Sequence, residues 1–161
     1  MGAAKIRVTS TPRRGVDGLA CGAVLRSLPE WFGMESANAQ YEADIPGLDT
    51  FTATDEAGDL LGFLAVKAHN EESQEIWVMA VRREWHRHGV GTRLMHTAEA
   101  WLASLGVRYV QVKTQGPSRD YEPYARTRAF YRAMAYVPIE EFTTLWDEEN
   151  PALLLVKRIE A

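Results

Sequence analysis

Apolar residues recur with two different periods along the chain, and the changes of period divide it into strands and helices. Alternating or continuous apolar runs predict strands at residues 6–10, 51–54, 60–68, 75–81, 109–112, 136–142 and 153–157. Helical spacing predicts helices over residues 19–28, 34–43, 89–105 and 124–134, with Pro29, Pro46 and Gly106 beyond the ends of the first three. Strands and helices therefore mix along the whole chain.

The central part of this pattern is a strand, a long amphipathic helix and a second strand, over residues 75–112. A strand–helix–strand unit of this kind implies one locally parallel pair in an otherwise mixed sheet. The first strand is almost continuously apolar from Ile76 to Val81, which favours a position in the middle of the sheet with both faces covered.

Length and charge narrow the class of protein. The 161 residues fit a single domain, 1–161, and carry 18 Lys and Arg against 22 Asp and Glu, for a net charge of −4. A general nucleic-acid binder is therefore disfavoured. The longest apolar run, Leu60–Val66, is far too short for a membrane helix. With Cys21 as the only cysteine and no leader or myristoylation pattern in Met1–Ile6, we expect a soluble, cytoplasmic protein.

The candidate chemistry lies where the central strand leads into the long helix. Gly89 and Gly91 stand at the helix start, where free backbone N–H groups and the helix dipole bind phosphate without basic side chains. The dinucleotide fingerprint is not matched, because Leu94 takes the place of its third glycine, and no Gly-Lys-Ser/Thr follows as in a P-loop. The two glycines alone are equally compatible with a tight turn that binds nothing.

The stretch Ile76–Leu94 reads IWVMAVRREWHRHGVGTRL and resembles the acetyl-CoA-binding motif of the GNAT acetyltransferase family. In that family a loop with the pattern Gln/Arg-x-x-Gly-x-Gly/Ala joins a strand to a helix. Both glycines match, whereas His86 replaces the usual Gln or Arg and Arg83 a common proline. The resemblance implies that pyrophosphate is bound by the main chain of Arg87, His88, Gly89, Val90, Gly91 and Thr92. It also implies that pantetheine is bound, as an added strand would be, by the main chain of Met79, Ala80 and Val81.

A second segment, TRAFYRAMAY over residues 127–136, resembles the Phe-Tyr-x-x-x-Gly-Phe element of the same family, with Ala135 in place of the glycine. The resemblance implies that Tyr131 protonates the departing CoA thiolate. A phenol of pKa about 10 donates to a thiolate of pKa about 8.5 only if the phenolate is stabilised locally. Adjacent helical residues face different directions, so we expect only one of Phe130 and Tyr131 to face the site. An ordinary core position for Tyr131 is the alternative.

Amide formation requires an uncharged amine, and a carboxylate near the central strand is the expected base. Glu75 stands where family members often carry a Glu that acts directly or through water, although a solvated turn residue is equally compatible. Glu30 is the second candidate. It begins the segment Glu30, Trp31 and Phe32, in a loop that lines the acceptor pocket in the family. Trp146, with the acidic residues 147–149, is expected to form the opposite wall and to suit a cationic acceptor, unless this run is a solvated loop.

Together the two resemblances imply an α/β (mixed α+β) fold with a mixed, mostly antiparallel sheet flanked by helices on both faces. They also imply an N-acetyltransferase that moves an acetyl group from acetyl-CoA directly to a primary amine of a small molecule, peptide or protein. A non-catalytic acyl-CoA sensor is the alternative. No metal is expected, because His86, His88 and His96 lack cysteines or carboxylates at a metal-ligand spacing. We expect no nucleic-acid or membrane partner, and exposed edge strands make a homodimer plausible.

Overall fold

The computed structural model describes residues 4–160. Its strands are β1 (Arg7–Val8), β2 (Asp49–Thr54), β3 (Leu60–Ala68), β4 (Ser73–Val81), β5 (Tyr109–Gln115), β6 (Val137–Asp147) and β7 (Asn150–Arg158). Its helices are α1 (Gly18–Arg26), α2 (Glu35–Asp44), α3 (Val90–Ser104) and α4 (Glu122–Ala133), with short 3-10 turns η1 (Ile45–Gly47) and η2 (Arg83–Trp85). The expectation that the chain carries no leader rests on Met1–Ile6, and residues 1–3 of this segment lie outside the described residues. Within 4–160, no helix is long and apolar enough to cross a membrane.

The strands form one seven-stranded sheet in the order β1-β2-β3-β4-β5-β7-β6. All neighbouring strands are antiparallel except β4 and β5, which are parallel and joined through α3. The predicted fold class is confirmed, and β4 occupies the central place in the sheet that its apolar character predicted.

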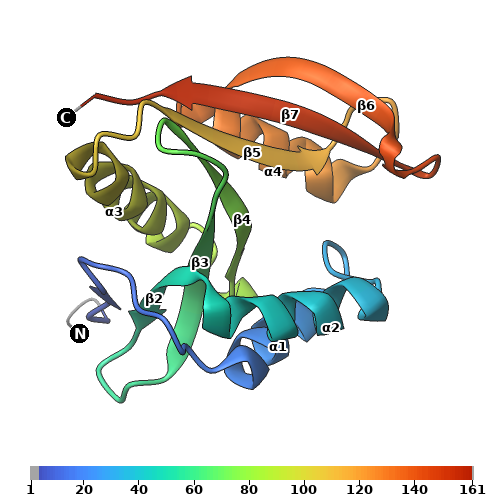
Figure 1. Cartoon of the computed structure of the whole chain (residues 1–161). Helices are drawn as coiled ribbons and strands as arrows, with labels where there is room; N and C mark the ends of the chain where they lie inside the picture. Colours follow the sequence, from blue (N-terminus) through green and yellow to red (C-terminus); the bar gives the residue numbers. More distant parts are fainter. Residues whose placement is uncertain (1–3, 161) are drawn as a thin grey trace.

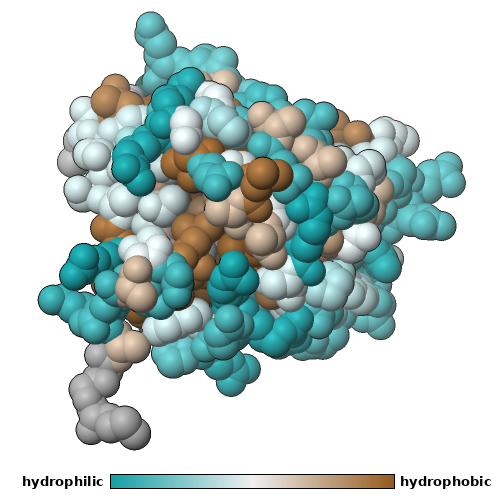
Figure 2. Space-filling view, turned by 90° about the horizontal axis from the view of Figure 1, so that it is seen from below, coloured by the Kyte–Doolittle hydropathy of each residue, from teal (hydrophilic) through white to brown (hydrophobic). Residues whose placement is uncertain are grey.

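Helices cover both faces of the sheet (Figure 1). The buried residues on the α1 side are Cys21, Val24, Leu25, Leu28, Ile45, Phe63, Ala65, Val78 and Ala80. On the other side α3 presents Leu94, Met95, Ala98 and Leu102, which form one apolar stripe at helical spacing, and α4 adds Tyr131. Figure 2 shows the molecule from below, with a mostly hydrophilic surface around a small apolar centre. The two apolar cores therefore lie on opposite faces of the same sheet.

The sheet opens in its middle. β4 and β5 pair only from Ser73 with Tyr109 to Ile76 with Val112, and beyond these residues the two strands diverge (Figure 1). Just after Ile76, β4 carries a bulge: Ala65 and Val66 of β3 are consecutive, but their partners on β4 are Val78 and Ile76. Trp77 is thus an extra residue, and such a bulge bends the strand. The last five residues of β4 are left with one edge that no strand within residues 4–160 covers.

Strand ends differ most from the sequence prediction at the sheet edges and on β5. β1 is only two residues long, whereas β5 continues to Gln115 because its last three residues pair with β7. These residues are polar or half-buried, so hydrophobic periodicity does not indicate them. β6 runs to Asp147 and places Trp146 in a strand rather than in a loop. β1 and β6 are the edge strands, and a homodimer through such an edge stays a prediction.

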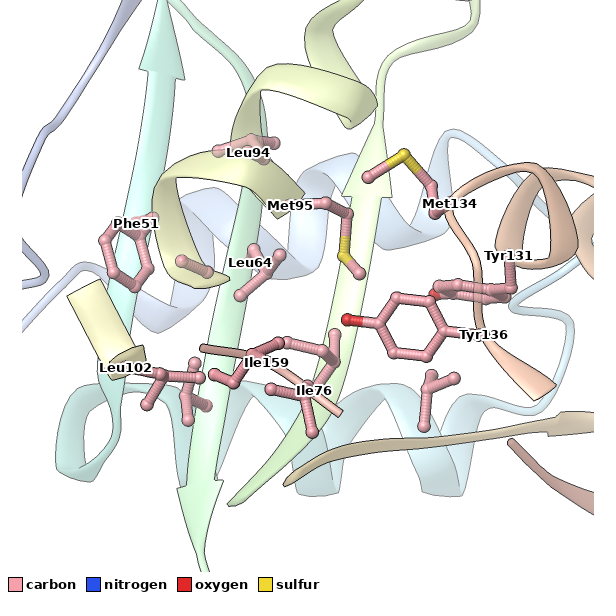
Figure 3. Close-up of a cluster of buried hydrophobic side chains, with 14 of the residues drawn as sticks. Phe51, Leu64, Ile76, Leu94, Met95, Leu102, Tyr131, Met134, Tyr136 and Ile159 are labelled. Carbon is pink, nitrogen blue, oxygen red and sulfur yellow. The ribbon is translucent and has the colours of Figure 1, made fainter. Parts of the chain in front are cut away.

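Glu99 of α3 and Tyr136, which follows α4, form a buried hydrogen-bonded pair. Tyr136, 2% exposed, donates its hydroxyl hydrogen to Glu99 Oε2 over 2.6 Å, and Lys157 Nζ donates to Glu99 Oε1 over 2.9 Å. The Tyr136 ring packs against that of Tyr131, with centroids 5.8 Å apart, and Figure 3 shows the two rings together at one side of the core cluster. This pair ties α3 to the segment that follows α4.

We expect Tyr136→Phe to lower the free energy of unfolding by about 1–3 kcal/mol, because one oxygen of the buried Glu99 carboxylate loses its donor. Urea denaturation measures the difference. Tyr109→Phe is the matched control, since Tyr109 is 37% exposed. Equal stability of the two variants would show that the Tyr136 hydroxyl does not stabilise the fold.

Candidate active site

A cavity of about 460 Å³ lies where β4 and β5 separate. Its walls come from β4, β5, the η2–α3 loop, α4 and the loop between α1 and α2, with Trp146 of β6. Because Trp31, Phe32 and Trp77 belong to the α1 side of the sheet and Phe130 and Tyr131 to the α3 side, the cavity passes through the sheet. After the roles that the sequence resemblance implies, we call the part next to α3 the donor end and the part next to the α1–α2 loop the acceptor end.

The donor end is formed by the start of α3. Gly89, the N-cap residue, has φ +77°, and the first intrahelical hydrogen bond runs from Arg93 N to Gly89 O over 3.0 Å. The N–H groups of Val90, Gly91 and Thr92 therefore have no partner within the helix. All three residues line the cavity, and the positive end of the helix dipole adds to their affinity for an anion.

The main-chain groups of β4 alternate between its paired edge and its open edge. Arg82 N donates to Leu61 O on β3 over 2.8 Å. Alternation along an antiparallel strand then turns the main chain of Ala80 toward β3 as well, and the main chain of Met79 and Val81 away from it. The peptide groups of Met79 and Val81 thus face the gap, while Ala80 contributes its surface but not its hydrogen-bonding groups.

His86 covers one of these open main-chain positions. Its Nε2 lies 2.7 Å from Val81 O, and since a carbonyl oxygen only accepts, this nitrogen carries the proton. The imidazole also packs edge-on against Trp31, with 5.8 Å between ring centroids. The residue that departs from the family pattern therefore fixes the end of β4, which the sequence alone did not indicate.

Tyr131 lies on the α3 side of the sheet. It is 6% exposed and lines the cavity. Burial raises the pKa of Tyr131 above its usual value, so the hydroxyl keeps its proton at neutral pH. Phe130 also lines the cavity and packs over Gly91. The expectation that only one of these adjacent aromatics faces the site is wrong, because both side chains line the cavity.

The acceptor end is a set of aromatic side chains held by hydrogen bonds. Trp31 Nε1 donates to Pro123 O and to Thr127 Oγ1, each over 3.1 Å, and Tyr124 donates its hydroxyl hydrogen to Trp31 O over 2.5 Å. Phe32 packs edge-on against Tyr41, with centroids 6.5 Å apart. The α1–α2 loop is thus attached to α4 across the cavity mouth.

Two carboxylates were predicted as the base, and neither lines the cavity. Glu75 is 3% exposed, and its Oε1 lies 2.7 Å from His69 Nε2 and 3.0 Å from Lys113 Nζ. Lys113 does line the cavity. Glu30 is at the surface, where hydrogen bonds from the Arg83 guanidinium hold the pKa of its carboxyl below the usual range.

Most of the other predicted residues are brought together. Met79, Ala80, Val81, Arg87, Gly89, Val90, Gly91, Thr92, Trp31, Phe32, Tyr131 and Trp146 all line the cavity. His88 lies outside the lining and packs against Trp85. Sequence reasoning missed Tyr41, Trp77, Lys113, Gln115, Tyr124 and Arg126. Extending the strand predicted at residues 109–112 by three residues would have included Lys113 and Gln115.

Within residues 4–160, no group of three or more His, Cys, Asp or Glu side chains could hold a metal ion.

Comparison with known proteins identifies the family. Residues 23–136 match the Acetyltransferase (GNAT) family, and no curated protein sequence matches significantly. A GNAT-family protein from Desulfovibrio desulfuricans superposes with a TM-score of 0.79 at 16% identity, over 97% of this chain and 99% of that one. The ribosomal-protein-S18-alanine N-acetyltransferase of Escherichia coli gives 0.75 at 13% identity, over 98% and 96% of the two chains. An aminoglycoside 6'-N-acetyltransferase complexed with coenzyme A gives 0.72 at 17% identity, over 96% and 98%.

The match spans well over half of the chain, which therefore belongs to the GNAT acetyltransferase family and is an acyl-CoA-dependent N-acyltransferase. The solved structures share its fold. The donor end has the chemistry that an acyl-CoA requires. Free N–H groups at a helix start suit the pyrophosphate, and the open edge of β4 suits the amide groups of pantetheine.

Gly89 offers a test of the loop geometry. An alanine at this position has room, because no atom lies within 4 Å of an added Cβ, but its φ of +77° is unfavourable for any residue with a side chain. We expect Gly89→Ala to lower the free energy of unfolding by about 1–2 kcal/mol and to weaken acetyl-CoA binding. Gly47→Ala is the control, since Gly47 has equal room and no positive φ. Denaturant titration compares the two, and equal stability would contradict the left-handed conformation of Gly89.

Proposed function

We propose that the chain works as one domain, residues 1–161, that transfers an acetyl group from acetyl-CoA directly to a primary amine of a small molecule, peptide or protein. The observation that carries this proposal is a single cavity whose lining includes the start of α3, the open edge of β4, a set of aromatic side chains and Tyr131. Direct transfer is supported by the environment of Cys21. Burial in the α1 core raises the pKa of this thiol to about 12, which disfavours it as a nucleophile.

Binding of the donor rests on main-chain groups. The N–H groups of Val90, Gly91 and Thr92 take the pyrophosphate, and Arg87, which lines the same end, supplies positive charge. The open main chain of Met79 and Val81 takes the pantetheine arm. An N–H group of this edge also stabilises the oxyanion that forms when the amine attacks the thioester carbon.

Proton transfers complete the reaction. As the new C–N bond forms and the C–S bond breaks, Tyr131 gives its hydroxyl proton to the sulfur. The amine must lose a proton before or during the attack. Glu75 is the better placed carboxylate, because its partner Lys113 lines the cavity, and a water molecule would connect the amine with it. His69 links Glu75 to solvent, since its side chain is 35% exposed.

The first test is thermal stability with acetyl-CoA at about 100 times its dissociation constant. One-site linkage predicts about 2.7 kcal/mol of stabilisation, which is a rise in melting temperature of about 5–11 °C for a domain of this size. Adenosine at the same concentration is the control and is expected to give no such shift. An unchanged melting temperature would mean that the η2–α3 loop does not hold coenzyme A.

The second test is Tyr131→Phe, which removes the proton donor. We expect kcat to fall by about 100-fold or more, with an unchanged dissociation constant for acetyl-CoA and unchanged activity of the control Tyr109→Phe. Because burial raises the pKa of Tyr131, wild-type activity is not expected to fall on its account below pH about 10. Release of free thiol in the presence of amines measures the rate. A full rate without Tyr131 removes it from the mechanism, and binding without turnover on any amine favours an acyl-CoA sensor.

A further inference from the structure

The cavity ends where the pairing of β4 and β5 begins. The two strands form four residue pairs, from Ser73 with Tyr109 to Ile76 with Val112. Ile76 and Val112, the last pair, both line the cavity, whereas no residue of the other three pairs is part of its lining. This last pair therefore closes the cavity at the point where the strands meet, and we call it the floor.

The two faces of the sheet have different chemistry at the floor. Ile76 and Val112 are 2% and 3% exposed and belong to the core cluster on the α3 side, and Figure 3 shows Ile76 inside this cluster. Side chains alternate along a strand, so Glu75 and Lys113 lie on the opposite face, where Lys113 Nζ donates to Glu75 Oε1 over 3.0 Å. The floor is thus apolar toward α3, and an ion pair lies beside it on the other face.

The donor end lies at the other end of β4. α3 follows the last residue of β4, Val81, after η2 and a short loop. In the proposed function the start of α3 binds the pyrophosphate, and the pantetheine arm runs from there along the open edge, past Val81 and then Met79. Continued in the same direction along β4, this path leads to Ile76 and the floor. The thioester at the end of the arm is therefore directed toward the floor.

Tyr131 relates the thioester to the apolar face. It belongs to the same core cluster as Ile76 and Val112 and lines the cavity with them. In the proposed reaction Tyr131 gives its proton to the sulfur, so the sulfur lies within hydrogen-bond distance of this hydroxyl. The acyl carbon is bonded to that sulfur, and apolar contacts favour an apolar acyl chain. The chain consequently points toward the side chains of Ile76 and Val112.

The floor is backed by packed side chains. Val110, which lies two residues before Val112 on β5 and on the same face, is 0% exposed and belongs to the same cluster. The ladder of β4 and β5 holds the backbone on both sides of the floor. Extra methylene groups in a close-packed core force side chains and backbone to shift, which is unfavourable. A longer acyl chain therefore meets a wall that does not yield easily.

We propose that Ile76 and Val112 set the length of the acyl group that the protein accepts, and that the floor admits an acetyl group and disfavours longer acyl chains. The two residues act by their shape and take no part in the proton transfers. This inference rests on the proposed function and adds to it the choice among acyl donors.

The test of the donor class measures dissociation constants by isothermal titration calorimetry, for which no acceptor amine is needed. Coenzyme A, acetyl-CoA and butyryl-CoA share the same phosphate and pantetheine groups and differ only in the acyl group. We expect the wild-type protein to bind butyryl-CoA at least about tenfold more weakly than acetyl-CoA, because two further methylene groups meet the floor. Equal constants would overturn the inference while leaving the proposed transfer of an acetyl group intact.

The test of the floor is the substitution Val112→Ala, which removes two methyl groups from it. We expect the preference for acetyl-CoA over butyryl-CoA to fall by about tenfold. Val110→Ala is the matched control, because Val110 is a buried valine of the same strand, face and core cluster but lies outside the cavity lining. It loses the same two methyl groups and is expected to keep the wild-type preference.

A milder variant, Ile76→Val, removes one methyl group from the other half of the floor. We expect it to shift the preference in the same direction as Val112→Ala but by a smaller factor. If Val112→Ala does not fold, Ile76→Val and the wild-type series still decide the question. A wild-type preference in every folded floor variant would show that the floor does not contact the acyl chain.

The remaining outcomes separate the two proposals. An equal shift in Val110→Ala and Val112→Ala would show that a loosened core, and not the floor, sets the preference, and this would overturn the inference. If coenzyme A, acetyl-CoA and butyryl-CoA all fail to bind the wild-type protein, the proposed donor site fails, and the inference about the acyl chain fails with it.

Discussion

The end of hydrogen bonding between β4 and β5 is the feature on which the site depends. Backbone N–H and C=O groups of a central strand must find partners, and a bulge at Trp77 turns β4 away from the strand that would supply them. The main chain of Met79 and Val81 is left facing a gap, which His86 covers only at Val81 O. A substrate with amide groups of its own can complete this edge. The described part of the sheet thus leaves this edge of β4 without a neighbouring strand.

The two ends of the cavity use different chemistry because they have different tasks. The donor end relies on main-chain groups and a helix start, which depend on backbone geometry and tolerate changes of side chain. In this chain His86 stands in the place of the usual Gln or Arg, and the loop still leads from η2 into α3 with Gly89 as its N-cap residue. The acceptor end is made of side chains such as Trp31, Tyr41 and Trp77, from segments far apart in sequence. Fold and donor chemistry therefore do not determine the acceptor.

The carboxylates around the site are engaged by partners that the sequence does not reveal. Glu75 shares one oxygen between Lys113 and His69, and Glu30 is held at the surface by Arg83. Asp147, in the acidic run that resembled the wall of a cationic pocket, is bound to Asn150. The acceptor end consequently has aromatic character, and its lysine and arginine, Lys113 and Arg126, are paired with Glu75 and Glu122. The pairs Glu75–Lys113 and Glu30–Arg83 join residues 38 and 53 positions apart.

The sequence by itself determined the order of strands and helices, the central place of β4, the glycine-containing loop before α3 and the family. These are properties of local periodicity and of contiguous motifs, which neighbouring residues set. Only the tertiary structure decided that β4 and β5 separate, that His88 lies outside the cavity, and that Glu75 is paired rather than free. Only it also placed Ile76 and Val112 at the closed end of the cavity. Hydrogen-bond direction and burial depend on contacts between distant segments, and no local pattern encodes them.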